Sequence, residues 1–226
     1  MKKITIAIDG FSATGKSTLA KQLAKHLGYI YVDTGAMYRA VTYFAMQNNY
    51  INQEKFDQQA LTYDLSKIKL TFQFNSNLGF AEMFLNGVNV ENEIRTIEVS
   101  SFVSKVAEIS QVRAKLVEQQ QEMGKNKGIV MDGRDIGTVV FPTAELKIFM
   151  TASPQTRAQR RYDEMSQKGE NVSFDAVLKN VQERDYIDTH REDSPLVQAH
   201  DAIEIDNSHL SREEQLQVVL NLVYTI

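Results

Sequence analysis

One short stretch near the N-terminus restricts the fold of this chain more than any other part of the sequence. Residues 10–18 read G-F-S-A-T-G-K-S-T and fit the pattern G-x-x-x-x-G-K-[ST] at every fixed position. An apolar run typical of a buried strand, residues 4–8, precedes the stretch, and a run at helical spacing, residues 19–27, follows it. A strand that passes into a helix through such a loop predicts an α/β fold, with the loop at the carboxyl end of the strand.

The residues of this loop have the chemistry to hold the phosphates of a nucleoside triphosphate. Gly10 and Gly15 let the backbone turn so that amide groups point inward, and the following helix adds the positive end of its dipole. Lys16 is placed to reach the outer phosphates, and the hydroxyl of Ser17 is a ligand for the accompanying Mg²⁺ ion. A strand-to-helix turn that merely contains these residue types is the alternative. We predict that ATP or GTP binds the whole loop, which consists of Gly10, Phe11, Ser12, Ala13, Thr14, Gly15, Lys16, Ser17 and Thr18.

Composition narrows the class of protein further. A chain of 226 residues, 42% hydrophobic and 24% charged, suits one large globular α/β domain. The formal net charge of -4 argues against general nucleic-acid binding, which favours a basic surface. The chain has no cysteine, so disulfides and thiolate metal sites are excluded, and its four histidines are scattered. No apolar run approaches membrane-spanning length, and we expect a cytoplasmic protein.

The remaining sequence alternates strand and helix patterns and is interrupted by one different segment. Strands and helices alternate from residue 4 to about residue 49, which implies parallel strands with crossover helices. Residues 68–74 then alternate apolar and polar, and Asn86-Gly87 suits a two-residue hairpin turn. We therefore predict a small antiparallel insert, preceded by a short helix at about residues 54–65.

Helix start signals mark the second half of the chain. Two helical stretches, 99–106 and 112–123, lead to a buried strand at residues 128–131. Further strands are predicted at 146–150 and 202–205. Ser153 is predicted as the N-cap of a helix that has Pro154 at its first position, a further helix is predicted to start near Ser173, and Ser211 to Glu214 is a capping box that predicts the last helix.

A triphosphate site alone leaves three classes open: a kinase, a hydrolytic machine and a nucleotide-controlled switch. A GTP switch needs N-K-x-D to read guanine, yet the only Asn-Lys pair, Asn126-Lys127, is followed by Gly and Ile. It also needs D-x-x-G, and no Asp here has Gly three positions later. These observations disfavour the switch.

Arginines accompany aspartates at three places expected near the phosphate loop. They are Asp33 with Arg39, Arg134 with Asp135, and Arg184 with Asp188 and Arg191. Arginine binds phosphate oxygens bidentately, and aspartate accepts hydrogen bonds from sugar hydroxyls or an exocyclic amine. A second anionic ligand with polar ring or sugar groups suits this mixture. Solvated surface ion pairs are the alternative for each group.

The motifs together resemble those of bacterial cytidylate kinases. Besides the phosphate loop they are D-T-G-A-M-Y-R at 33–39, E-I-R-T at 93–96 and D-G-R-D-I-G-T-V-V at 132–140, and the similarity runs from residue 4 to about residue 206. The resemblance implies the α/β fold of P-loop nucleoside monophosphate kinases: a parallel sheet flanked by helices, a small antiparallel monophosphate-binding insert and a helical lid. It also implies transfer of the γ-phosphate of ATP to CMP or dCMP, with Mg²⁺.

The same resemblance implies roles for individual residues. Ser104, Arg113 and Asp135 would face the cytosine, and Thr34 stands where many relatives have Ser or Thr. The acceptor phosphate would be bound by Arg39, Arg134 and Arg191, and the sugar by Arg184 and Asp188. Lid arginines would be Arg157, Arg160 and Arg161. The implied catalytic residues are Lys16, Arg134, Arg157 and Arg161. One departure is Phe11, because the family's loop usually has Pro there, which puts the rigidity of the loop in question.

The resemblance also implies a division of one kinase domain into regions. The core would comprise residues 1–34, 92–152 and 196–226, the monophosphate-binding region about 35–91 and the lid about 153–170. We expect a monomer that binds small molecules and neither nucleic acid nor membrane. Two alternatives stay open: a P-loop kinase acting on AMP, UMP or a non-nucleotide, and a nucleotide-dependent binding protein.

Overall fold

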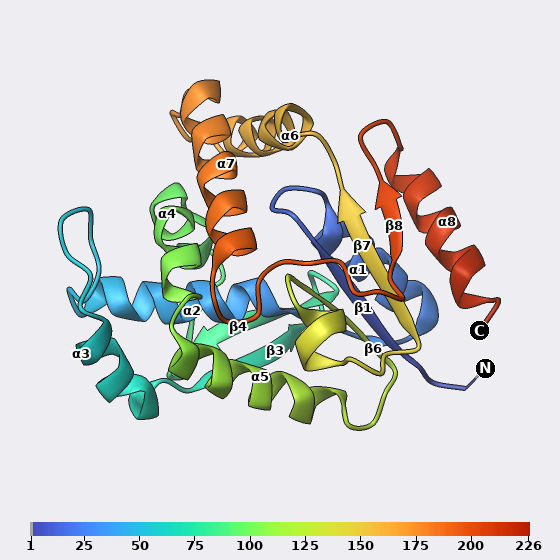
Figure 1. The fold of residues 1–226 in the computed structure, drawn as a ribbon, viewed down its shortest axis with the longest axis horizontal. Coiled ribbons are helices and arrows are strands. Elements are labelled where there is room, and N and C mark those ends of the chain that lie inside the picture. The colour runs from blue at the N-terminus through green and yellow to red at the C-terminus, as the bar shows by residue number, and fades with distance from the viewer. Residues whose placement is uncertain (1) are drawn as a thin grey trace. The chain divides into compact units, whose positions relative to one another are not determined.

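The computed structural model, which describes residues 2–226, contains one five-stranded sheet and one three-stranded sheet (Figure 1). The larger sheet has the strand order β2-β6-β1-β7-β8, and β1 pairs in parallel with both β6 and β7. The smaller sheet has the order β3-β4-β5 and is antiparallel. The predicted fold class, an α/β protein with a parallel sheet and a small antiparallel insert, is confirmed.

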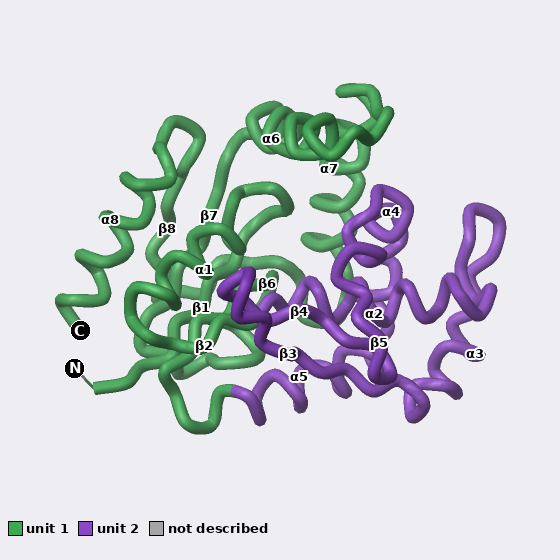
Figure 2. Tube along the Cα trace, turned by 180° about the vertical axis from the view of Figure 1, so that it is seen from behind, with its two compact units in different colours: residues 1–32, 124–226 green, residues 33–123 purple. Residues whose placement is uncertain are grey.

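The chain forms two compact units, coloured separately in Figure 2. The first comprises the residues up to Val32 together with Gly124–Ile226, and the second is Asp33–Met123. Residue 1, the first of the predicted core, lies outside the described residues. Whether the predicted core, monophosphate-binding region and lid act as functional regions stays a prediction.

The first unit is built on the larger sheet. The strands are β1 (Thr5–Gly10), β2 (Ile30–Asp33, whose last residue opens the second unit), β6 (Ile129–Gly133), β7 (Leu146–Thr151) and β8 (Ile203–Asp206). The helices are α1 (Lys16–Leu27), α6 (Pro154–Gln167), α7 (Phe174–His190) and α8 (Arg212–Val223). One core cluster joins apolar side chains of β1, β6, β7, β8, α1 and α8. Because β1 is buried along its whole length, the loop that follows it starts from a rigid support.

The second unit has its own core, in which helices cover the small sheet. Its elements are α2 (Thr34–Gln47), α3 (Gln58–Tyr63), β3 (Leu70–Asn75), β4 (Phe80–Leu85), β5 (Val88–Asn89), α4 (Ile97–Val106) and α5 (Ser110–Gly124, whose last residue belongs to the first unit). Its core cluster joins side chains of α2, α4 and α5 to residues of β3 and β4, Met83 among them. The predicted hairpin turn at Asn86-Gly87 is confirmed, with both residues at positive φ.

Helix caps explain where the sequence predicted helix starts correctly and where it did not. The caps predicted at Ser153 and Ser211 are confirmed, because each serine accepts a hydrogen bond from a backbone amide of the first turn. Ser173, near which a helix start was predicted, caps α7 in the same way. The predicted helix at about 54–65 was too long at its start. Asp57 accepts from the amide of Ala60, which fixes the start of α3 at Gln58, and a 3₁₀ turn follows the helix.

The segment after β6 holds a feature that the sequence did not predict. Residues Ile136–Val140 form a π-helical turn, which directly follows the Asp135 of the D-G-R-D run. Such turns are rare and often lie at functional sites.

Among the residues that the structure describes, no helix is both long and apolar enough to cross a membrane.

We expect Gly10→Ala to prevent stable folding. Gly10 has φ +140°, and a Cβ atom there would lie 2.1 Å from the carbonyl oxygen of Met150 on the neighbouring strand β7. Relieving that overlap would separate β1 from β7, at a cost of about 4 kcal/mol or more. Gly28→Ala is the matched control, because Gly28 has φ +66° with open space around it and should cost only about 1–2 kcal/mol. Urea unfolding of both variants checks this; equal losses would contradict it.

Candidate active site

The phosphate loop occupies the turn from β1 into α1, as its sequence predicts. Gly15, directly before the helix, has φ +91°, and Ala13 also has a positive φ of +57°. The backbone thus reverses direction within a few residues, which brings successive peptide groups close together. This is the geometry of a backbone cradle for anions at a helix N-terminus.

Lys16 is folded back into this loop. Its Nζ donates to the carbonyl oxygens of Gly10 at 2.8 Å and Phe11 at 2.5 Å, and to the hydroxyl of Thr14 at 3.3 Å. Burial lowers the pKa of Lys16 well below its usual value; the charge of Arg134 acts in the same direction, and Asp132 opposes it. A phosphate group bound here would place negative charge next to the buried ammonium group and would favour its charged form.

Ser17 and Asp132 form an oxygen pair next to the loop. The Ser17 hydroxyl donates to Oδ2 of Asp132 at 2.9 Å, and the Tyr31 hydroxyl donates to Oδ1 of the same carboxylate at 2.8 Å. A hydroxyl and a carboxylate are the hard ligands that P-loop proteins offer to Mg²⁺. Among the described residues no group of three or more His, Cys, Asp or Glu could hold a metal ion. The Ser17 hydroxyl and the Asp132 carboxylate together offer oxygen ligands of the kind that Mg²⁺ prefers.

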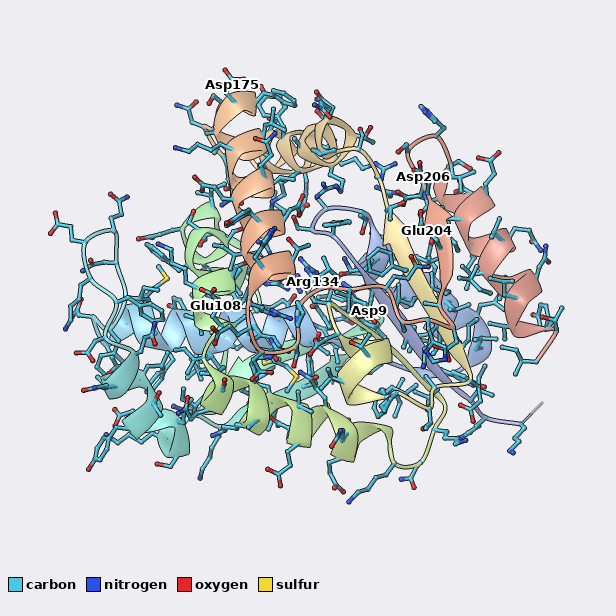
Figure 3. The ribbon with its side chains drawn as sticks, in the orientation of Figure 1. Asp9, Glu108, Arg134, Asp175, Glu204 and Asp206 are labelled. Carbon is cyan, nitrogen blue, oxygen red and sulfur yellow. The ribbon has the colours of Figure 1, made fainter. Side chains whose placement is uncertain are left out.

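Asp9 fixes the π-helical turn from β1. Its carboxylate accepts the backbone amides of Ile136 at 2.8 Å and Gly137 at 2.7 Å. Burial raises the pKa of Asp9 to about 7; the two amides oppose this, and the neighbouring Asp135 adds to it. Figure 3 labels Asp9, on β1, and Arg134, which follows β6. Asp135 itself is buried at the start of the turn, where the sequence predicted a substrate contact.

Arg134 forms an ion pair with α7. Its Nε lies 2.9 Å from Oδ2 of Asp188, whereas the sequence grouped it with its neighbour Asp135. Burial alone would raise the pKa of Asp188, but the charges of Arg134, Arg184 and Arg191 outweigh it and lower the pKa. The structure thus brings four of the predicted substrate residues into one charged cluster, in which Asp188 and Arg191 are buried and Arg134 and Arg184 are partly buried. Arg191, at the end of α7, also donates to the carbonyl oxygen of Ser194.

The three predicted lid arginines of α6 have different surroundings. Arg157 is buried, forms a two-hydrogen-bond pair with Asp185 and lies 5.0 Å from the ring centroid of Phe11. Arg160 donates to Asn207. Arg161 pairs with Glu164, one turn further along its own helix, at 3.2 Å. Of the three, Arg157 and Arg160 also reach carbonyl oxygens of the phosphate loop.

Within the second unit, Asp33 holds two arginines. Its Oδ2 lies 3.0 Å from Arg39 and 2.9 Å from Arg95, and its Oδ1 accepts the amide of Ala36 as the cap of α2. Burial alone would raise the pKa of Asp33, but the charges of Arg39 and Arg95 lower it well below its usual value. Glu91 accepts two further hydrogen bonds from Arg95. Two guanidinium groups are therefore fixed beside the first turn of α2.

The other predicted substrate residues of this unit lie on helices and are buried. Thr34 is the first residue of α2, and Ser104 lies on α4. Arg113, on α5, is almost completely buried and donates to the carbonyl oxygen of Ala107 at 3.1 Å. Its guanidinium lies 5.6 Å from the ring centroid of Tyr38. A buried guanidinium held in this way is a fixed donor.

Several residues of the site were missed by the sequence prediction. Asp132 carried a usable signal, because it lies next to the end of the buried strand that precedes the predicted Arg134. Arg95 stands in the E-I-R-T motif without an assigned role. Asp9, Tyr31 and Asn207 carried no local signal, since only the fold brings them to their partners.

The phosphate loop, at the end of a central parallel strand, and the neighbouring hydroxyl–carboxylate pair define a P-loop nucleotide-binding protein. A family model described as "Cytidylate kinase" matches residues 6–225. The chain therefore belongs to the cytidylate kinase family, and the predicted resemblance is confirmed.

Individual proteins are similar to this chain over all or nearly all of its length. A cytidylate kinase from Flavobacterium psychrophilum is 79% identical, with 100% of both chains covered. One from Bacteroides thetaiotaomicron is 59% identical and covers 95% of this chain and 94% of its own. The solved structure of an uncharacterized protein from Eubacterium ventriosum gives a TM-score of 0.52 at 11% identity, covering 100% of both chains. That last similarity concerns the fold alone.

We expect Asp9 to make stability pH-dependent. A carboxyl whose pKa is raised by folding destabilises the fold as it ionises, so stability is highest below its unfolded pKa, near 4, and falls as pH rises toward about 7. Between pH 5 and pH 8 the wild type should lose about 2–3 kcal/mol through this group. Asp9→Asn cannot ionise and should lack that loss in urea unfolding at the two pH values. Parallel pH profiles for the two proteins would rule the assignment out.

Proposed function

We propose that this chain transfers the γ-phosphate of ATP to CMP or dCMP and gives CDP or dCDP plus ADP. Its family is one of ATP-dependent nucleoside monophosphate kinases, so the reaction class is phosphotransfer to a phosphate acceptor. The observation that carries the proposal is the phosphate loop, in which buried Lys16 lies beside the pair Ser17 and Asp132. A kinase needs this combination to hold a triphosphate and its metal.

ATP is the phosphate donor, and the phosphate loop is its proposed site. Lys16 would exchange its contacts with loop carbonyls for contacts with the outer phosphates. The backbone amides of the loop and the N-terminus of α1 would face the same groups.

Mg²⁺ is proposed to accompany ATP. Ser17 and Asp132 would hold it, and Tyr31 would keep the Asp132 carboxylate in place through its hydrogen bond to Oδ1. When bound, the ion supplies positive charge between the outer phosphates. The buried position of Asp132 supports this role, since a desolvated carboxylate attracts a cation strongly.

CMP contacts are proposed for the residues to which the resemblance assigns them. Arg39, Arg134 and Arg191 would bind the acceptor phosphate, and Arg184 with Asp188 would bind the sugar. Ser104, Arg113 and Asp135 would face the cytosine, and Thr34 is proposed as a further substrate contact.

Arg95 is a further candidate for the acceptor phosphate. It shares the Asp33 carboxylate with Arg39, so two guanidinium groups are held together by one negative charge within the second unit. Asp33 leaves the two arginines with one net positive charge, and the carboxylate of Glu91, which also pairs with Arg95, neutralises it. A phosphate dianion suits such a pair because each fork can donate two hydrogen bonds.

The mechanism that these residues support is in-line phosphoryl transfer, in which the protein positions the reactants and stabilises charge and takes little part in covalent chemistry. Lys16 and Arg134 would neutralise the charge that spreads over the moving phosphoryl group, and Arg157 and Arg161 are proposed to assist from α6. The acceptor phosphate is already ionised at neutral pH and needs no strong general base. Exclusion of water would prevent wasteful hydrolysis of ATP.

The organisation of the chain supports further parts of the proposal. Residues of about 153–170, which include α6, are proposed as the lid, and residues of about 35–91 as the monophosphate-binding region, attached to the predicted core. We also propose a monomeric, cytoplasmic enzyme. These proposals are separate from the chemistry and can fail independently of it.

We expect ADP release from ATP to be stimulated strongly by CMP and dCMP and only weakly by UMP, AMP or GMP. A coupled assay with each acceptor, with no acceptor and without Mg²⁺ measures this directly. The carboxylates and arginines assigned to the cytosine and phosphate provide the physical reason for the preference. Equal slow release with every acceptor would sink the proposal in favour of a hydrolase or a nucleotide-dependent binding protein.

Lys16→Ala and Arg134→Ala should each lower kcat by about 10²–10³-fold, because each removes a charge that stabilises the transition state. Turnover is measured per folded molecule, with the folded fraction taken from urea unfolding. Arg212→Ala is the matched control, since Arg212 is an exposed arginine at the start of α8. Activity that declines only in proportion to the folded fraction would refute these two roles.

A further inference from the structure

Three side chains from outside the phosphate loop hold its carbonyl oxygens. Arg157 donates to the carbonyl of Ser12 at 3.3 Å. The carbonyl of Thr14 accepts from the carboxamide of Asn207 at 2.5 Å and from Arg160 at 3.4 Å. These hydrogen bonds are made to backbone carbonyl oxygens. A phosphate cannot bind those oxygens, because its own oxygens are also acceptors.

Asn207 is the most deeply placed of the three. It follows β8 directly, after Asp206, which Figure 3 labels, and its backbone amide donates to the carbonyl of Thr151 on β7. The side chain is 0% exposed. Its Nδ2 donates to Thr14 and, at 2.9 Å, to Gln215 of α8, while its Oδ1 accepts from Arg160 at 3.0 Å. Each polar atom of the carboxamide is therefore used, and the orientation of the amide is fixed.

The bond to Thr14 determines the direction of the next amide group. In a trans peptide the C=O and N–H bonds point in opposite directions, and none of the described peptide bonds is cis. With the Thr14 oxygen held by Asn207, the N–H of Gly15 must point away from Asn207. Gly15 has φ +91° and no side chain of its own to restrain the peptide, so the restraint has to come from elsewhere.

We propose that Asn207 is a positioning residue for ATP: by holding the Thr14 carbonyl it presents the Gly15 amide to the phosphates. The proposal rests on the proposed function, in which ATP binds the phosphate loop. Asn207 does not touch the nucleotide; it acts through the peptide between Thr14 and Gly15. A donor at this position is required, and a carboxylate of the same shape would repel the carbonyl.

A purely structural role is the competing explanation. In that role Asn207 only attaches α8 to the sheet through Gln215, whose own Nε2 donates to the carbonyl of Leu210. The two roles differ in what they predict for Gln215. Gln215→Met removes the attachment to α8 but leaves the bond to Thr14, whereas Asn207→Asp removes the donor to Thr14.

The test compares Asn207→Asp and Gln215→Met with the wild type. ATP affinity is measured by calorimetry with Mg²⁺ and without CMP, KM values for ATP and CMP are measured separately, and thermal unfolding is recorded for each protein. We expect Asn207→Asp to weaken ATP binding at least tenfold, which corresponds to about 1.4 kcal/mol, and to leave the KM for CMP within twofold. Gln215→Met should unfold at a lower temperature but bind ATP within twofold of the wild type.

Three results would overturn the proposal. They are ATP affinity within twofold of wild type in Asn207→Asp, an equal loss of affinity in Gln215→Met, and a parallel rise of the KM values for ATP and CMP. If Asn207→Asp does not fold, the same criteria apply to Asn207→Ser, which also loses the carboxamide but adds no charge. A wild type that binds ATP without CMP-stimulated turnover would defeat the proposed function, while the calorimetry would still decide the role of Asn207.

Discussion

The balance of buried charge around the phosphate loop is the constraint on which the first unit depends. Lys16 is buried and Arg134 is largely so, and the carboxylates of Asp132 and Asp188 favour the charged forms of these two side chains. Removing one of these carboxylates leaves a cation without compensation in a medium that solvates it poorly. The strand ends of β1 and β6 and the last turns of α7 are therefore held together by electrostatics as well as by packing, and the same charges are the ones a triphosphate would meet.

Much of this arrangement was predictable because its signals are local. The phosphate loop is determined by consecutive residues, and the hairpin turn by the dipeptide Asn86-Gly87. The helix starts are determined by serines that cap the first turn of their own helix. Each of these depends on neighbours in the chain, so the sequence alone specifies the conformation. The family resemblance extended this to the fold class and to the enzyme class.

The parts that escaped prediction are set by contacts between distant segments. Asn207 meets Thr14 across 193 positions of the sequence, and Asp9 meets Gly137 across 128. Arg134 pairs with Asp188 on another element, although a closer carboxylate stands next to it in the chain. The π-helical turn is likewise held by the carboxylate of Asp9, and no pattern in residues 136–140 predicts this contact.

Phe11 shows how a change within a motif can be accommodated outside it. Its ring packs edge-on against Phe149 of β7, with centroids 6.1 Å apart, and its other neighbour is the guanidinium of Arg157. Proline would stiffen the loop through its own ring, whereas here Phe11 is held by an edge-on contact with an aromatic ring of the sheet and by a cation–π contact with an arginine of α6. Rigidity at this position is consequently a shared property of three elements, so its loss could originate in a substitution far from the loop in the sequence.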